Sequence, residues 1–205
     1  MKKELITILR NKKTTTDLFR QCSEQIGFIL ANEASSQLSP KSISVETPLT
    51  KTTGSTFSDN IVLVPILRSG IALLDPFLKF FPKANVGFVG LRRDEKTAIA
   101  QMYYYKVPPI TPETEIIILD PMIATGGSGL EALRILKEAG ASEDKIVFAA
   151  IIAAPEGIKK IQTAHLKIKI VVIQVDEKLN DQKFIVPGLG DFGDRYFGTP
   201  DATCM

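Results

Sequence analysis

Continuous apolar runs dominate the chain from residue 61 onward, and they show little alternation with polar residues. The runs are rich in β-branched side chains and cover 61–67, 86–91, 116–119, 146–153 and 168–175. Strands that are buried on both faces have this composition. Because helical segments are predicted between most of these strands, the pattern indicates an α/β fold with a mostly parallel sheet flanked by helices.

Helices are predicted between the strands, where apolar residues recur at helical spacing. Proline and glycine mark their limits: Pro76 restricts the first helix, Gly140 ends the second and Pro155 begins the third. The three predicted helices are 71–81, 129–139 and 156–166. The segment 92–109 is long for a connection between a strand and a helix, so it is interpreted as a functional loop or a projecting hairpin.

The first sixty residues differ in pattern from the rest of the chain. Apolar residues at helical spacing predict one amphipathic helix at 14–34. The stretch 35–60 is rich in Ser and Thr, holds one strand candidate at 43–46, and is interpreted as an irregular excursion. We expect a single domain, 1–205, made of an N-terminal helix and excursion (1–60), a core (61–178) and a C-terminal hood and tail (179–205).

Composition excludes several classes of protein. The 205 residues are 44% hydrophobic and 23% charged, which is typical of a globular domain. A formal net charge of +2 is too small to indicate a nucleic-acid binder. The longest apolar stretch, 146–154, is far shorter than the ~20 residues that span a bilayer, and no signal peptide is recognisable. Two cysteines and one histidine do not supply a metal site or a disulfide framework, so we expect a cytoplasmic protein without membrane contact.

The clearest chemical signal lies where the third apolar run ends. The run leads into a helix through Asp120, Pro121, Met122, Ile123, Ala124, Thr125, Gly126, Gly127 and Ser128. Backbone N–H groups in such a turn converge on an anion, and the helix dipole adds to the attraction. The glycines leave room for a phosphate, and the carboxylate of Asp120 suits the hydroxyl groups of a ribose. The segment therefore predicts a site for a sugar phosphate.

A second anion site is predicted after the first apolar run, where Arg68 precedes a helix that opens at Gly70. In a parallel sheet both loops emerge at the carboxyl edge, where ligands of such sheets bind. Arg92 and Arg93 also follow a strand and can reach this edge. For these two residues, a solvated surface pair is an equally acceptable interpretation.

Four segments resemble the type I phosphoribosyltransferases. Asp-Pro-Met-Ile-Ala-Thr-Gly-Gly-Ser at 120–128 is similar to the loop that binds phosphoribosyl diphosphate (PRPP) in that family. The segment 64–70 resembles the family's pyrophosphate loop, and 90–97 resembles the start of its mobile loop. The segment 185–199 is similar to the uracil-binding hood that distinguishes the uracil phosphoribosyltransferase branch.

The resemblance implies a phosphoribosyltransferase fold and the reaction of uracil with PRPP to give UMP and pyrophosphate, a step of pyrimidine salvage. It implies that PRPP contacts Asp191 and the residues 120–128 together with Arg68 and Arg93. Of these, it assigns catalysis to Arg93, Asp120 and Asp191. It implies that uracil contacts Ile185, Gly190, Asp191 and Phe192. Mg²⁺ is expected to arrive with PRPP, and the resemblance further implies a homo-oligomer and raises GTP as an effector.

Two alternatives stay open at this point. One is a phosphoribosyltransferase for another base, against which the hood argues. The other is a regulator that senses nucleotides through the PRPP site and binds nucleic acid, to which the small net charge gives little support. The Gly-x-Gly-x-x-Gly pattern at 188–193 is not a dinucleotide fingerprint, because too little chain follows it for a βαβ unit.

Overall fold

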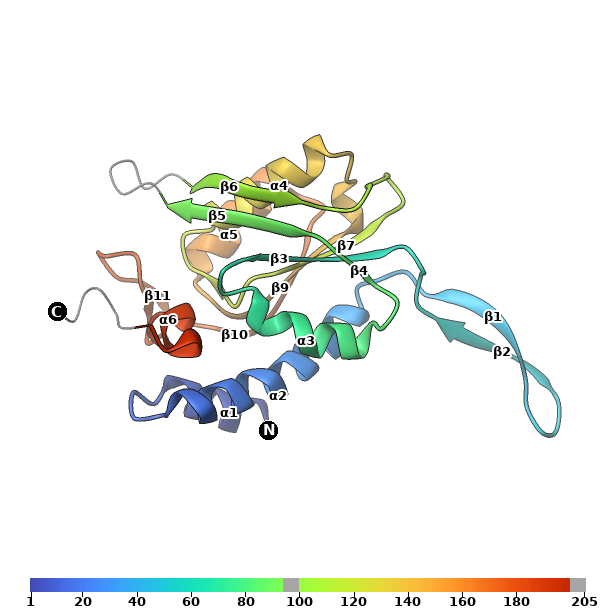
Figure 1. Cartoon of the computed structure of the whole chain (residues 1–205), viewed down its shortest axis with the longest axis horizontal. Coiled ribbons are helices and arrows are strands. Elements are labelled where there is room, and N and C mark those ends of the chain that lie inside the picture. Colours follow the sequence, from blue (N-terminus) through green and yellow to red (C-terminus); the bar gives the residue numbers. More distant parts are fainter. Residues whose placement is uncertain (94–99, 200–205) are drawn as a thin grey trace.

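The computed structural model describes residues 1–93 and 100–199, and its centre is one mostly parallel sheet. The strand order along the main path of the sheet is β10-β9-β7-β3-β5-β6 (Figure 1). The parallel strands are β3 (Ile61–Leu67), β5 (Phe88–Arg93), β7 (Glu115–Leu119), β9 (Ile146–Ala153) and β10 (Lys169–Val175). Two short strands, β4 (Asn85–Val86) and β8 (Met122–Ile123), pair with β3 and β9. The predicted α/β architecture is confirmed.

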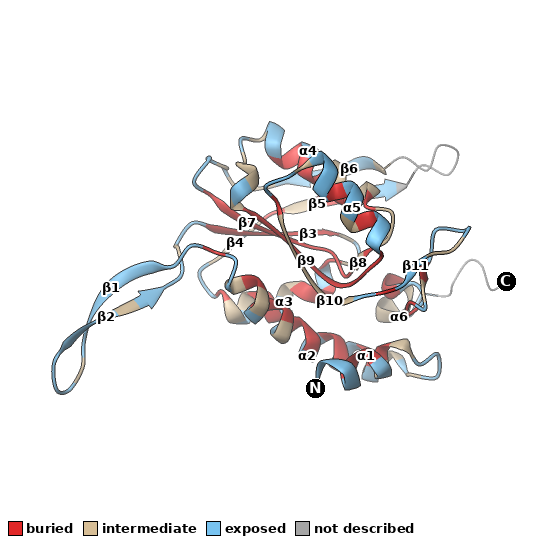
Figure 2. Cartoon of the chain, turned by 180° about the vertical axis from the view of Figure 1, so that it is seen from behind, coloured by how far each residue is buried: buried red, intermediate tan, exposed pale blue. Residues whose placement is uncertain are grey.

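Helices cover both faces of this sheet (Figures 1 and 2). One face carries α1 (Lys2–Arg10), α2 (Thr16–Ser35) and α3 (Ile71–Phe80), and the other carries α4 (Gly127–Glu138) and α5 (Pro155–Ala164). Successive residues of β9 alternate between these layers: Val147 and Ala149 join the core under α1–α3, while Phe148 and Ala150 join the core under α4 and α5. Continuous apolar strands are therefore the consequence of a sheet that is covered twice.

The stretch 35–60 is more ordered than its sequence indicates. Strands β1 (Lys41–Glu46) and β2 (Lys51–Thr56) form an antiparallel hairpin that projects from the rest of the molecule (Figure 1). The strand candidate at 43–46 lies within β1, but the interpretation of the whole stretch as irregular is wrong. The sequence of β2, Lys-Thr-Thr-Gly-Ser-Thr, has no apolar side chains, and both faces of the hairpin are largely exposed, so no apolar pattern marks this strand.

The segment 92–109 contributes β6 (Ala100–Lys106), which pairs antiparallel with β5 at the edge of the main sheet. The expectation of a hairpin is confirmed by the pairing of β5 with β6, and residues 94–99 lie outside the described residues. A 3₁₀ turn (Glu143–Lys145) precedes β9. In 1–93 and 100–199, no helix is both long enough and apolar enough to cross a membrane.

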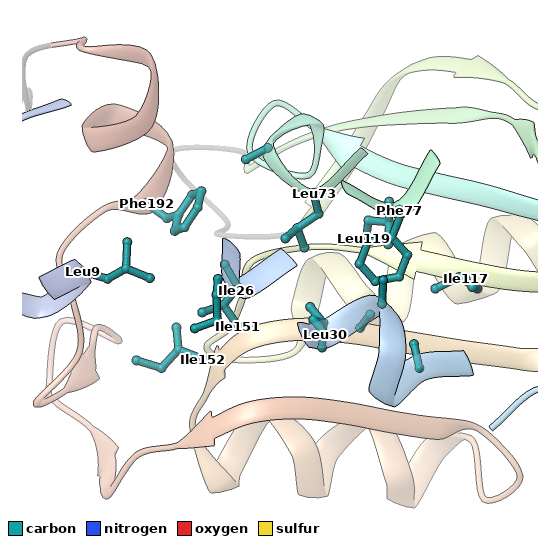
Figure 3. Close-up of a cluster of buried hydrophobic side chains, with 14 of the residues drawn as sticks. Leu9, Ile26, Leu30, Leu73, Phe77, Ile117, Leu119, Ile151, Ile152 and Phe192 are labelled. Atoms are coloured by element: carbon teal, nitrogen blue, oxygen red, sulfur yellow. The ribbon is translucent and has the colours of Figure 1, made fainter. Parts of the chain in front are cut away.

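The described part of the hood, 179–199, packs on the N-terminal helices. It contains β12 (Ile185–Val186), paired with β11 (Lys178–Leu179), and the helix α6 (Phe192–Phe197). The ring of Phe192 meets Phe19 of α2 edge-on, with ring centres 5.0 Å apart. Figure 3 shows Phe192 pointing into the same apolar cluster as Leu9 of α1 and Ile26 of α2. The two ends of the chain thus share one core.

The shared core generates a stability prediction. Phe19→Ala removes a fully buried ring that lies against the hood, and we expect it to lower the free energy of unfolding by about 3–5 kcal/mol. Its neighbour Leu18 is 40% exposed, so Leu18→Ala should cost no more than about 0.5 kcal/mol. Urea denaturation of both variants measures the difference, and equal losses would contradict the packing described.

Candidate active site

A cavity of about 480 Å³ opens at the carboxyl edge of the sheet, between the ends of the strands and the hood. Segments far apart in the sequence form its wall. They are the end of β3 with the residues after it, the loop after β7, Leu91 of β5 and the hood. The lining residues are Ile66, Leu67, Arg68, Ser69, Leu91, Asp120, Met122, Ala124, Ser128, Lys183, Phe184, Ile185, Gly190, Asp191, Phe192 and Gly193.

A smaller hollow of about 60 Å³ adjoins this cavity and is formed by the loop 122–129 with Asp120 and Phe148. Residues 125–128 of this loop, here called the phosphate turn, lead directly into α4, whose N-terminus faces the hollow. Backbone N–H groups at a helix start, joined by the helix dipole, attract an anion. The hollow is thus suited to a phosphate group.

Gly126 gives the phosphate turn its shape. Its φ of 75° lies in the left-handed region, which side chains disfavour. A Cβ at this position would also lie 2.8 Å from the carbonyl oxygen of Gly157 in α5. Gly157 in turn packs directly against the carbonyl of Ala124, so a side chain there would push the turn outward. The close approach of α5 therefore fixes the turn from behind.

Gly127 serves a different purpose, because the space in front of it is open. A Cβ at Gly127 would meet only Thr125 Oγ1, at 3.5 Å. The hydroxyl of Thr125 lies 3.4 Å from the Gly127 N–H, and Ser128 lines both cavities. The turn therefore presents hydroxyl and N–H groups to an open space at the start of α4.

Asp120 is held at the junction of the two cavities. Its backbone N–H donates to the carbonyl of Ala149 in β9 at 3.2 Å, which continues the hydrogen-bonding of β7. The side chain belongs to a residue only 9% exposed, and burial raises the pKa of its carboxyl to about 7. Hydrogen bonds from the Met122 N–H and the Ser69 hydroxyl oppose this increase in pKa. The carboxylate can accept hydrogen bonds from the hydroxyl groups of a sugar.

Arg68 is positioned differently from Asp120. Its side chain is 62% exposed and forms an ion pair with Asp194 of α6 at 3.6 Å, with the guanidinium 5.8 Å from the centre of the Phe197 ring. Exposed ion pairs of this kind are weak, so the guanidinium is free to turn toward an anion in the cavity. Asp191 caps α6, because its carboxylate Oδ1 accepts a hydrogen bond from the Asp194 N–H at 2.9 Å.

The structure brings together most of the residues predicted from the sequence. Around the larger cavity lie Arg68, Asp120, Met122, Ala124, Ser128, Ile185, Gly190, Asp191 and Phe192. Around the smaller one lie Ile123, Thr125, Gly126 and Gly127. Pro121 is an exception, because it lines neither cavity and its carbonyl accepts the N–H groups of Ile151 and Ile152 at 3.0 Å. The side chain of Arg93 lies outside the described residues.

The structure shows where the bulky side chain of Phe192 lies. The residue is 1% exposed, and its ring packs between Phe19 and Tyr196. The side chain therefore fills the core beneath the hood. The residue also borders the cavity that the hood covers.

Sequence reasoning missed two residues that shape the site. The hydroxyl of Ser69 reaches Asp120, with 3.5 Å between the oxygen atoms. Gly157 supports the phosphate turn from α5. Ser69 follows Arg68 directly within the segment 64–70, and this position was the available signal. For Gly157 the signal was weak, since its contact with the turn depends on how α5 packs.

The buried carboxyl of Asp120 generates a prediction on stability and pH. Because its pKa is raised in the folded chain, the folded state binds the proton more tightly, and stability falls as pH rises from about 4 to 7. Asp120→Asn removes this cost. We expect the variant to match the original chain near pH 4 and to exceed its free energy of unfolding by about 1–3 kcal/mol at pH 8.

Urea denaturation at pH 4.5, 6 and 8 measures this difference. Asp144→Asn is the control, because the Ser142 hydroxyl lowers the pKa of that exposed carboxyl and no gain at high pH is expected. A gain for Asp120→Asn that does not change with pH would contradict the assignment.

Comparison with known proteins agrees with this geometry. Residues 1–199 match the family model described as uracil phosphoribosyltransferase. A uracil phosphoribosyltransferase of Finegoldia magna is 48% identical over 198 residues, which cover 96% of this chain and 94% of the relative. One from Bacillus cereus is 46% identical over 195 residues, covering 95% and 92%.

A solved structure, the AQ2163 protein of Aquifex aeolicus, superposes with a TM-score of 0.87 at 35% identity. The match covers 97% of this chain and 94% of that one. The family model and the two relatives extend over nearly the whole chain, so the likeness includes the phosphate turn, the Arg68 loop and the hood. The chain belongs to the uracil phosphoribosyltransferase family.

Proposed function

We propose that the chain transfers the 5-phosphoribosyl group of PRPP to N1 of uracil in the cavity at the sheet edge, giving UMP and pyrophosphate. One observation carries the proposal: the phosphate turn, the buried Asp120 and the hood, which are distant in sequence, border one space of about 480 Å³ and its adjoining hollow. Family membership and this convergence support the same reaction.

The phosphate and the ribose of PRPP are assigned to the loop after β7. The N–H groups and hydroxyls of 125–128 hold the 5′-phosphate at the N-terminus of α4. Asp120 accepts hydrogen bonds from the two ribose hydroxyls, which fixes the sugar relative to the phosphate. Thr125 and Ser128 supply the side-chain hydroxyls of this subsite.

The pyrophosphate of PRPP is assigned to the side of the cavity where Arg68 lies, together with Arg93. Mg²⁺ arrives with PRPP, held mainly by oxygen atoms of the substrate and water, as this ion prefers. The donor set fits such an ion: Asp120 and Asp191 border the cavity, and no cluster of three or more metal-binding side chains occurs in the described ranges. When bound, Mg²⁺ neutralises charge on the leaving pyrophosphate.

Uracil is assigned to the hood, where Ile185, Gly190, Asp191 and Phe192 border the cavity. Both carbonyl groups and the N3–H of uracil can be matched by backbone groups of an irregular segment. Backbone reading requires that the path of the chain be defined: Pro187 restricts it, and Gly188 and Gly190 allow the positive φ angles that it takes. The ring of Phe192 packs against Phe19 and Tyr196, which anchors this part of the hood beside the cavity.

The chemical step follows from this arrangement. N1 of uracil forms a bond to the anomeric carbon, the bond from that carbon to pyrophosphate breaks, and its electron pair leaves with pyrophosphate. The N1 proton is released to solvent. The chain's contribution is to align N1 with the anomeric carbon and to stabilise the negative charge that grows on the leaving group, for which Arg68 and Arg93 are assigned. Asp191 faces the PRPP side of the hood.

Three further properties belong to the proposal. The chain forms a homo-oligomer, for which the exposed apolar residues Ile43 and Val45 of the hairpin and the exposed tyrosines 103–105 offer surface. The resemblance also raises GTP as an effector, and we include GTP binding in the proposal. The enzyme acts in the cytoplasm and binds no nucleic acid, in keeping with its low cysteine content and small net charge.

A panel of free bases tests the reaction. The purified chain is incubated with PRPP, Mg²⁺ and uracil, cytosine, adenine, guanine, hypoxanthine or xanthine, and pyrophosphate release is followed. Of the six bases, we expect only uracil to give pyrophosphate release, with UMP detected by chromatography. Release with a purine base would contradict uracil as the substrate. If no base gives release, the nucleotide-sensing regulator becomes the better interpretation. A gel-shift assay with RNA and DNA tests that interpretation directly.

The open space before Gly127 generates a second prediction. Gly127→Val places a side chain where the phosphate is assigned, and its Cβ would meet Thr125 Oγ1 at 3.5 Å and no backbone atom beyond its own helix and chain neighbours. We expect it to weaken PRPP binding by more than about 100-fold, while the midpoint of thermal unfolding changes by a few degrees at most. Gly127→Ala, with a smaller side chain, should show an intermediate loss. Calorimetry measures the affinity, and normal binding by the valine variant would refute the role of the turn.

A further inference from the structure

The segment of the hood that precedes Gly190 is held by a buried ion pair with the N-terminal helix. Asp176 follows β10, and its side chain is 1% exposed. Arg10, the last residue of α1, binds both carboxylate oxygens of Asp176 through its two terminal nitrogen atoms, with Nη1 2.9 Å from Oδ2. The pair joins parts of the chain 166 residues apart.

This pair fixes both polar groups of Gly188. The Gly188 N–H donates to Asp176 Oδ2 at 2.8 Å. The Gly188 carbonyl accepts from Arg10 Nη1 at 2.9 Å. The carboxylate and the guanidinium thus hold the two sides of one residue, and neither Arg10 nor Asp176 lines the cavity.

The next carbonyl is held in the same way by Arg195 of α6. Its Nη1 donates to the Leu189 carbonyl at 2.6 Å and to the Leu9 carbonyl, and its Nη2 donates to the Asn11 carbonyl at 2.7 Å. Carbonyl groups at the end of α1 and in the hood therefore share one guanidinium. The N-terminal helix and the hood are tied together at two neighbouring points.

Because peptide groups are planar, these hydrogen bonds also determine the direction of the next N–H groups in the base subsite. In a trans peptide the C=O and the following N–H point in opposite directions. Because the carbonyls of Gly188 and Leu189 point toward the arginines, the N–H groups of Leu189 and Gly190 point away from them. Gly190 lines the cavity, and in the described part of the chain its backbone makes no hydrogen bond. Its N–H is thus available to a ligand there.

We propose that Arg10 and Asp176 are positioning residues of the uracil subsite: the pair sets the orientation of the 188–190 backbone and thereby the affinity for the base. This inference rests on the proposed function, and it makes the N-terminal helix α1 part of base recognition. Since the phosphate turn and Arg68 make no contact with the pair, the effect belongs to uracil and not to PRPP.

A purely structural role predicts something different. If the pair only attached α1 to the rest of the molecule, its loss would lower thermal stability and the fraction of active enzyme. Both substrates would then be affected alike, through kcat. A positioning role instead raises KM for uracil and leaves KM for PRPP in place.

Three variants and one control separate these outcomes. Arg10→Met removes the hydrogen bonds of Arg10 to Asp176 and to the Gly188 carbonyl. Arg10→Lys keeps the charge without the bidentate geometry of the guanidinium. Asp176→Asn keeps an acceptor for the Gly188 N–H. The control, Arg134→Met, removes an arginine that also binds two carboxylates, those of Glu131 and Glu138, but lies on the exposed side of α4.

We expect KM for uracil to rise tenfold or more in Arg10→Met and Asp176→Asn and by a smaller factor in Arg10→Lys. KM for PRPP, and the affinity for PRPP by calorimetry, should stay within twofold in all of them and in the control. Unchanged KM for uracil, or equal increases for both substrates, would overturn the inference. If Arg10→Met does not fold, Arg10→Lys and Asp176→Asn decide the question by the same criterion.

The failure of the proposed function would look different. In that case the unaltered chain would not convert uracil with PRPP at all, and the variants would have no uracil KM to compare. Conversion by the unaltered chain with no selective effect in the variants would leave the proposed function intact and remove only the role of the pair.

Discussion

The register of β7 between β3 and β9 is the constraint on which the site depends. Leu119 pairs with Pro65 on one side and with Ala149 on the other, so Asp120 emerges one residue later beside the loop after β3. Parallel strands share one carboxyl edge, and the loops of β3 and β7 therefore open into the same space. A slip of one residue would turn Ile116 and Ile118 to the opposite layer and move Asp120 out of reach of Ser69.

A second constraint comes from the two ends of the chain. The sheet supplies only one side of the cavity, and the hood supplies the other. The hood is small and contains little regular structure, so its position depends on what it packs against. Phe192 anchors the hood to α2 through an apolar contact. Hydrogen bonds from Arg10 and Arg195 hold two backbone carbonyl groups of the hood. The N-terminal helices, which contribute no residue to the cavity lining, therefore determine the shape of the cavity.

The parts of this structure that were predictable are those with local causes. The apolar runs predict buried strands because both faces of each strand need apolar side chains. The sequence from Asp120 to Ser128 predicts an anion site because its glycines and hydroxyl groups act within one turn. What escaped prediction depends on distant partners. The β2 strand has no apolar residues and forms by pairing with β1, and the role of Asp176 depends on its contacts with Gly188 and Arg10. No spacing rule connects Asp176 with Arg10.

Three features at the cavity are shaped by its function more than by the packing of the fold. Asp120 is a buried carboxyl whose pKa is raised by burial, although the Met122 N–H and the Ser69 hydroxyl donate hydrogen bonds to it. Gly126 adopts a left-handed conformation, and Arg68 is exposed with only a weak partner. Burial of the Asp120 carboxyl costs stability near neutral pH, and each of the three features leaves a group or a space that a phosphoribosyl substrate can use. A doubly covered apolar sheet can tolerate this cost because its stability comes from residues far from the edge. The same chain can therefore keep a rigid core and hold a charged, incompletely satisfied site at its rim.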